Sequence, residues 1–164
     1  TRYESSAASD VYKRQGTMSK ALEVNALSSW RMLQCCERLC REQSTQTFEV
    51  WVNTSEAEIQ PAVSPAYELS KRLLGQLVSV RGATRSAEER SQLVLRKLVL
   101  GPFRSELNPI GVMTADFVAG QVLWQARMGA RLIIVTPNPL TYVLMPLTEV
   151  GRRLYSRSLS HPDP

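Results

Sequence analysis

Three short apolar runs alternate with longer amphipathic stretches, and this alternation is the strongest constraint on the fold. The runs TFEVWVN (47–53), QLVLRKLVL (92–100) and RLIIV (131–135) are rich in β-branched or apolar residues, which predicts strands. Between them, apolar residues recur every three or four positions, which predicts helices. Because strands that alternate with helices pair in parallel and carry the helices on their faces, we expect an α/β fold. Its sheet should be short, with about three parallel strands.

The helix-like stretches have recognisable limits. Helices are predicted over 19–41 and 65–80, and a third begins at the potential cap Thr114 and runs to Met128. We expect the inner side of this third helix to carry Phe117, Val118, Val122, Leu123 and Ala126. Residues 81–90 form a charged linker or helix end. The uninterrupted apolar run 131–135 indicates a strand buried on both faces.

Charge and cysteine content narrow the function classes. Twenty Lys and Arg residues against fifteen Asp and Glu give a net charge of +5, which favours anionic ligands. The positive residues are scattered and not interleaved with aromatic residues, so no nucleic-acid partner is expected. Cys35, Cys36 and Cys40 have no nearby His and no second pair, so we predict no metal site. Reduced thiols, with no apparent signal peptide or spanning segment, indicate the cytoplasm.

The two ends of the chain differ from its middle. Residues 1–17 are polar and show no apolar period, which predicts a disordered or non-native leader. The predicted domain therefore covers 18–164. His161, the one histidine of the sequence, lies in the terminal SHPDP and is given no role.

A tyrosine and a lysine stand four residues apart on a predicted helix. Tyr67 and Lys71 therefore project from one face at neighbouring turns. A nearby ammonium favours the phenolate and lowers the tyrosine pKa from about 10, as proton exchange near neutrality requires. The alternative is a packed tyrosine beside a solvated lysine.

Further polar residues stand where a ligand crevice would lie. Ser55 and Ser105 each follow a predicted strand, and the carboxyl ends of parallel strands border the crevice of such folds. Asn25 is a polar amide within a predicted helix, where its hydrogen bonds must be met. The alternatives are a turn-capping serine for Ser55 and an exposed or locally bonded amide for Asn25.

Together, VNALSSW, VNTSEAEIQPAVSPAYELSKR and LVLGPFRSELNP resemble the catalytic half of a short-chain dehydrogenase/reductase, from about Met18 to the C-terminus. The resemblance implies a partial Rossmann-like, three-layer α/β/α fold. It implies that Tyr67 is the general acid/base and that Lys71 lowers its pKa and binds the nicotinamide ribose. By the same resemblance, Ser55 would hold the substrate oxygen and Asn25 a water of the proton relay.

The resemblance also implies a cofactor, a substrate and a partner. NAD or NADP would transfer hydride to or from a small-molecule carbonyl or alcohol, with Gly101, Pro102 and Ser105 beside the nicotinamide. The sequence has Gly-Pro where the family usually has Pro-Gly. A homodimer through the helices that carry Asn25 and Tyr67 is also implied.

The glycines nowhere form the Gly-rich turn that cradles a pyrophosphate at a helix N-terminus. We therefore expect an N-terminally truncated fragment that binds NAD or NADP poorly and turns over little. Its first strand should be an unprotected sheet edge.

Two other readings stay open. The apolar run IIVTPNPLTYVLMPL followed by Arg152, Arg153 and Arg157 could form a basic amphipathic helix at a membrane surface. The simpler interpretation is a C-terminal helix that covers the core or narrows the substrate entrance. Its apolar residues are Leu140, Val143, Leu144, Leu147, Val150 and Leu154. A non-catalytic homologue is the other alternative.

Overall fold

A parallel sheet of three strands, in the order β1-β2-β3, forms the centre of the computed structural model. The strands are β1 (Phe48–Ser55), β2 (Leu93–Leu100) and β3 (Leu132–Val135). The structure describes residues 17–43, 47–106, 109 and 111–159. Of the predicted leader, residues 1–16 lie outside the described residues, as does His161, whereas Thr17 is already helical.

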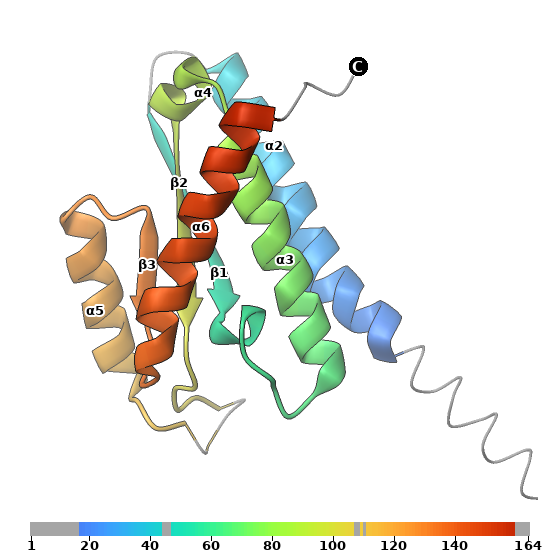
Figure 1. The fold of residues 1–164 in the computed structure, drawn as a ribbon, viewed down its shortest axis with the longest axis vertical. Helices are drawn as coiled ribbons and strands as arrows, with labels where there is room; N and C mark the ends of the chain where they lie inside the picture. Colours follow the sequence, from blue (N-terminus) through green and yellow to red (C-terminus); the bar gives the residue numbers. More distant parts are fainter. Residues whose placement is uncertain (1–16, 44–46, 107–108, 110, 160–164) are drawn as a thin grey trace, which may run out of the picture.

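Helices flank the sheet on both faces (Figure 1). In chain order they are η1 (Glu23–Leu27, a π-helical turn), α2 (Ser28–Glu42), η2 (Glu56–Glu58, a 3-10 turn), α3 (Pro65–Thr84), α4 (Ala87–Gln92), α5 (Ala115–Arg127) and α6 (Pro139–Leu159). The predicted α/β class and the partial Rossmann-like arrangement are confirmed.

The side chains of β2 point alternately to the two faces and define two layers of core. Leu98 and Leu100 face α5, whose buried residues are Val118, Val122 and Ala126. Leu95 packs against α2 and α3, and Val99 packs against α6. One face of the sheet thus carries α2, α3 and α6, and the other carries α5.

The helix limits match the sequence pattern with two additions. The predicted helix 19–41 runs over residues 17–42, and a π-helical turn interrupts it at Asn25. The charged segment 81–90 divides into the last turn of α3 and the start of α4. The division falls at Ser86, whose side chain accepts a hydrogen bond from Glu89 N–H while the Glu89 carboxylate accepts one from Ser86 N–H. This reciprocal capping box starts a new helix where the pattern alone indicates only charge.

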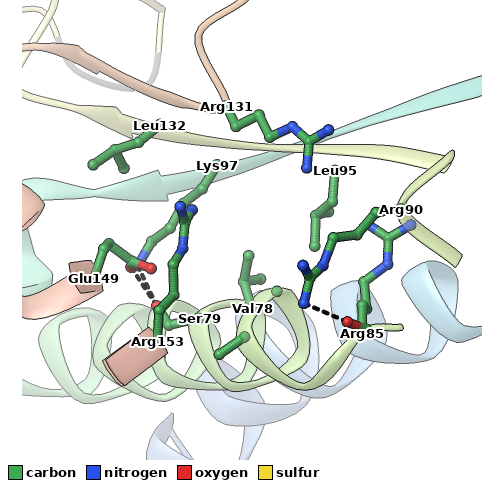
Figure 2. A pocket seen from close by; sticks show the side chains of 12 residues that line it. Val78, Ser79, Arg85, Arg90, Leu95, Lys97, Arg131, Leu132, Glu149 and Arg153 are labelled. Carbon is green, nitrogen blue, oxygen red and sulfur yellow. Dashed lines mark hydrogen bonds and ion pairs between the residues drawn. The ribbon is translucent and has the colours of Figure 1, made fainter. Parts of the chain in front are cut away.

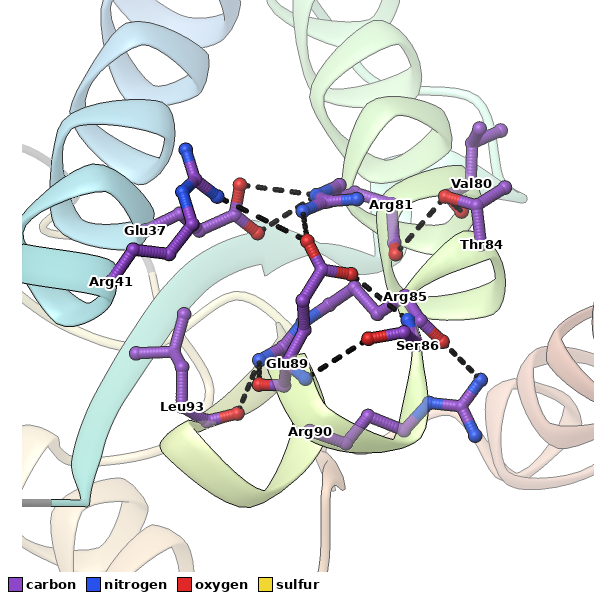
Figure 3. A network of polar contacts seen from close by, with 10 residues as sticks. All are labelled: Glu37, Arg41, Val80, Arg81, Thr84, Arg85, Ser86, Glu89, Arg90 and Leu93. Carbon is purple, nitrogen blue, oxygen red and sulfur yellow. Dashed lines mark hydrogen bonds and ion pairs between the residues drawn. The ribbon is translucent and has the colours of Figure 1, made fainter. Parts of the chain in front are cut away.

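An ionic network ties α2, α3 and α4 together beside this division (Figure 3). Arg81 Nε donates to both carboxylate oxygens of Glu37, at 2.9 and 3.0 Å, and its terminal nitrogen donates to Glu89 at 2.5 Å. Glu37 comes from α2, Arg81 from α3 and Glu89 from α4. The network therefore fixes the end of α3 that lies away from Tyr67.

The inner faces of two helices differ from expectation. On α5, Val118, Val122 and Ala126 are buried as predicted, but Phe117 and Leu123 are exposed. On α6 the difference is larger, because its buried residues are Thr141, Met145 and Glu149. The residues expected to cover the core are exposed: Leu140, Val143, Leu144, Leu147, Val150 and Leu154. The interpretation in which these six residues cover the core was therefore wrong.

Within the described ranges, no helix is long and apolar enough to cross a membrane. In the same part of the chain, no group of His, Cys, Asp and Glu residues could hold a metal ion.

Candidate active site

A cleft of about 870 Å³ opens at the carboxyl ends of β1 and β2. Its walls come from the end of β1 and η2, the segment that leads into α3, the first turns of α3, and the segment after β2. The lining residues are Asn53, Thr54, Ser55, Glu56, Ala57, Pro61, Ala62, Val63, Ser64, Tyr67, Lys71, Leu100, Gly101, Pro102, Phe103 and Ser105. Of the seven predicted site residues, six line this cleft and Asn25 does not.

Ser55 is the last residue of β1 and is buried. Its hydroxyl oxygen accepts a hydrogen bond from Ala57 N–H at 3.2 Å and so caps the turn η2. The turn-capping alternative therefore describes what Ser55 does in this structure. Its hydroxyl can still donate, since an accepted hydrogen bond leaves the O–H free.

Tyr67 and Lys71 lie on the first two turns of α3, which begins at the N-cap Ser64. The Ser64 hydroxyl accepts from Tyr67 N–H at 3.4 Å, and Pro65 at the first helical position favours the helix start. The Lys71 ammonium nitrogen lies over the Tyr67 ring, 5.7 Å from its centroid. The spacing of four thus brings the two side chains together as predicted.

The surroundings of Lys71 leave its ammonium available. Its nitrogen donates to the Asn53 carbonyl at 3.3 Å, its one hydrogen bond among the described residues. Because an ammonium has three donors, it can still bind a ligand oxygen in the cleft. Burial lowers the pKa of Lys71 below its ordinary value, although the Glu58 carboxylate acts in the opposite direction.

Asn25 acts on this site through α3. Its side-chain amide donates to the Ser70 hydroxyl at 3.0 Å, and that hydroxyl donates to the Tyr67 carbonyl at 2.8 Å. Ser70 is fully buried. Asn25 is therefore a positioning residue for the turn that carries Tyr67, and its place in a π-helical turn is a feature common at functional sites.

The segment after β2 forms the opposite wall. Pro102 and Ser105 line the cleft with Gly101. A Cβ on Gly101 would lie 2.5 Å from the Thr136 hydroxyl, so glycine is needed here for close packing of the segments that follow β2 and β3. The packing of Gly101 thus has a structural cause apart from any ligand.

A second group of charged residues surrounds Lys97 of β2. The sequence analysis did not predict this group. The Lys97 cluster consists of the buried residues Lys97, Glu58, Ser79 and Glu149. Lys97 Nζ lies 2.6 Å from a Glu58 oxygen and 2.8 Å from a Glu149 oxygen, and it donates to the Ser79 hydroxyl at 2.9 Å. A lysine in the apolar run LVLRKLVL was the available signal.

The Lys97 cluster borders another cavity, of about 180 Å³, towards the amino ends of β2 and β3 (Figure 2). Arginines from α4, from the start of β3 and from α6 line it: Arg90, Arg131 and Arg153. Its one lysine is already paired with two carboxylates. This cavity therefore lacks a pair comparable to Tyr67 and Lys71.

The chain is 44% identical over 147 residues to the monoglucosyldiacylglycerol epimerase of Synechocystis sp. (strain ATCC 27184 / PCC 6803 / Kazusa). The match covers 88% of this chain but 34% of the relative, so the chain spans about a third of the protein it resembles. No protein-family model matches the chain.

These findings correct the predicted family and reaction. No family model supports the short-chain dehydrogenase/reductase assignment, and the relative is named an epimerase of a glycolipid. The oxidoreductase prediction was wrong because Tyr67, Lys71 and Ser55 specify only proton handling at an oxygen. Such chemistry serves reactions with and without net oxidation, so the motif could not identify the overall reaction.

Proposed function

We propose that this chain is the part of a sugar-lipid epimerase that holds the sugar and moves its protons. The observation that carries the proposal is the Tyr67 and Lys71 pair in a cleft at the carboxyl ends of parallel strands. The relative's name supplies the substrate class, a monoglucosyl diacylglycerol. A cleft of about 870 Å³ lies within the usual range of small-molecule sites, which suits a hexose headgroup.

The residues of the chain take separate roles in this proposal. The Tyr67 phenol exchanges a proton with a sugar hydroxyl, and the Lys71 ammonium beside it favours the phenolate during that exchange. The Ser55 hydroxyl donates to the same sugar oxygen and orients it. Asn25 and Ser70 hold the α3 turn so that Tyr67 keeps its place.

Inversion at a sugar carbon also needs a way to break a carbon–hydrogen bond that no adjacent carbonyl acidifies. A bound NAD or NADP would accept a hydride and return it to the opposite face, with no net oxidation of the sugar. The spare donors of Lys71 fit the ribose hydroxyls of such a cofactor. The sequence has no Gly-rich turn to hold the pyrophosphate of this cofactor. The residues present therefore fit the nicotinamide end of the cofactor and not its pyrophosphate.

The proposal includes the expected homodimer and the expected cellular compartment. Exposed apolar side chains on the outer sides of α2 and α3, among them Met32, Leu39 and Leu69, support a homodimer through these helices. Light scattering that gives the mass of a monomer would exclude it. We also propose a cytoplasmic location, in keeping with the free cysteines Cys35, Cys36 and Cys40.

A chimera tests the proposed function. The matching 147-residue region of the Synechocystis relative is replaced by that of this chain, and conversion of monoglucosyldiacylglycerol to its epimer is measured. The chimera should convert the lipid, and Tyr67→Phe should reduce turnover by about 10²- to 10⁴-fold, the usual contribution of general acid–base catalysis.

Tyr155→Phe is the matched control, because Tyr155 is an exposed tyrosine on α6 outside the cleft lining. It removes the same hydroxyl group and should leave turnover unchanged. A Tyr67→Phe chimera as active as the control would refute the role of Tyr67.

A further inference from the structure

The outward side of α6 carries a continuous apolar stripe. We define this outer stripe as the exposed residues Leu140, Val143, Leu144, Leu147, Val150 and Leu154. They recur at intervals of three and four, so they share one face along most of the helix. A helix of 21 residues is roughly 30 Å long, which makes the stripe a long apolar line on the surface.

The burial pattern of α6 is reversed for a helix that only covers a core. Towards the sheet it presents Thr141, Met145 and Glu149, of which two are polar, while its leucines and valines face outward. The polar inner residues are held by specific partners. Thr141 accepts a hydrogen bond from Gln60 at 2.9 Å, and Glu149 pairs with Lys97 at 2.8 Å. The orientation of α6 is therefore fixed, and the apolar side must face something else.

The start of α6 lies next to the mouth of the cleft. The Gln60 side chain that bonds Thr141 belongs to the segment between η2 and α3, and the neighbouring Pro61 lines the cleft. Thr136, just before α6, donates to the carboxylate of Glu56, another lining residue. The N-terminal end of the stripe is thus the part of it that lies nearest to the cleft.

The net charge and the lipid of the relative indicate which surface this is. A net charge of +5 favours an anionic surface. Arg152 and Arg153 point away from the stripe, because Arg152 donates a hydrogen bond to Gln76 of α3 and Arg153 lines the cavity beside the Lys97 cluster. The relative is named for a diacylglycerol lipid. A lipid with two acyl chains is itself anchored in a bilayer.

We propose that the outer stripe of α6 is the surface by which the protein lies on a lipid bilayer, with the cleft beside the headgroups. This inference deepens the proposed function, since it states how the cleft reaches a lipid-anchored sugar. The stripe leucines and valines enter the boundary of the acyl chains.

Vesicle binding by the whole chain tests the proposal. Partitioning onto vesicles of phosphatidylcholine with phosphatidylglycerol is measured by co-sedimentation for the wild type, for Leu147→Glu and for Leu123→Glu. Leu147→Glu should weaken binding at least tenfold, because it removes a leucine from the apolar boundary and places a charge there. Leu123→Glu places the same charge on an exposed leucine of α5 and should bind as the wild type does.

Two further measurements separate the possible results. Circular dichroism should show that both variants keep the wild-type melting temperature, because both positions are exposed. Vesicles of phosphatidylcholine alone should bind the wild type more weakly, because the net charge of +5 favours an anionic surface. Wild-type protein that stays in the supernatant, or equal losses for the two variants, would overturn the membrane surface on α6.

The test in the chimera keeps this proposal distinct from the proposed function. Leu147→Glu should lower turnover on lipid in vesicles and leave turnover on a short-chain, water-soluble analogue unchanged. Tyr67→Phe should lower both by about 10²- to 10⁴-fold without changing vesicle binding. Loss of the soluble reaction in Leu147→Glu would contradict a docking role for the stripe.

Discussion

Lys71 and Lys97 lie on the same side of the sheet, and their surroundings differ in almost every respect. Lys97 is buried in β2 between Glu58 and Glu149, and it also donates to Ser79. Lys71 lines the open cleft and has a single carbonyl acceptor and a tyrosine ring beside it. The Lys97 ammonium is already paired with two carboxylates and so has a structural role. The Lys71 ammonium has spare donors in the cleft and can bind a ligand oxygen.

The comparison also explains the pKa directions. Burial raises the pKa of Glu58 above its ordinary value even though Lys97 acts to lower it. Burial lowers the pKa of Lys71, and the same Glu58 carboxylate acts to raise it. The Glu58 carboxylate thus acts on both lysines. Replacing either lysine should therefore also alter the electrostatic surroundings of the other.

The largest expected difference in stability is between substitutions of the two lysines. Lys97→Met leaves Glu58 and Glu149 buried without a cation, which should cost about 3–5 kcal/mol in the free energy of unfolding. Lys71→Met removes a charge that burial already disfavours, and the cost should stay below about 1 kcal/mol. Urea unfolding of both variants measures the two values. Similar losses would show that the lysines do not differ as described.

Two glycines of α3 sharpen the comparison. A Cβ at Gly75 would lie 1.9 Å from the Glu58 carboxylate, so Gly75→Ala should push Glu58 away from Lys97 and cost about 1–3 kcal/mol. Gly82→Ala is the control on the same helix, because nothing lies within 4 Å of its Cβ position. There alanine should stabilise by about 0.5–1 kcal/mol. Thermal melts that rank the two variants in the reverse order would contradict the packing of the Lys97 cluster.

The pH dependence of stability tests the environment of Glu58. A carboxyl group whose pKa is raised by folding adds stability below its unfolded pKa, near 4.5, and loses it as the pH rises through the folded value. Glu58→Gln does not titrate, so its stability relative to the wild type should rise as the pH increases above about 4.5. Denaturant unfolding across this range measures the difference. A difference that falls with pH would mean that Lys97 outweighs burial.

The smallest expected effect concerns the support of Tyr67. Asn25→Ala removes the hydrogen bond to Ser70, with a cost of about 0.5–1.5 kcal/mol in stability. In the chimera, turnover should also fall, and Asn25→Gln should restore part of it if the amide orients the α3 turn. Loss of stability with unchanged turnover would leave Asn25 a structural residue only.

The sequence predicted the helices and strands better than the contacts between distant segments. The alternation of strands and helices, the cap at Thr114 and the nearness of Tyr67 to Lys71 all rest on local spacing, and each is confirmed. The Lys97 cluster joins four segments separated by up to 91 positions, and local patterns carry no such contact. The side of α6 that faces the sheet could not be predicted either, because the burial of Glu149 depends on its distant partners Lys97 and Ser79. The spacing of Tyr67 and Lys71 also could not identify the net reaction, because proton transfer is common to several reactions.

The most direct test of the central claim is where the sugar lipid binds. Backbone amide chemical shifts of the whole chain are followed by NMR while a short-chain glucosyl diacylglycerol is added. Shifts should concentrate at Ser55, Tyr67, Lys71 and Phe103, around the cleft. Shifts confined to the cavity beside Arg131 and Arg153, or an unchanged spectrum at saturating lipid, would contradict the assignment of the Tyr67 and Lys71 cleft as the sugar site.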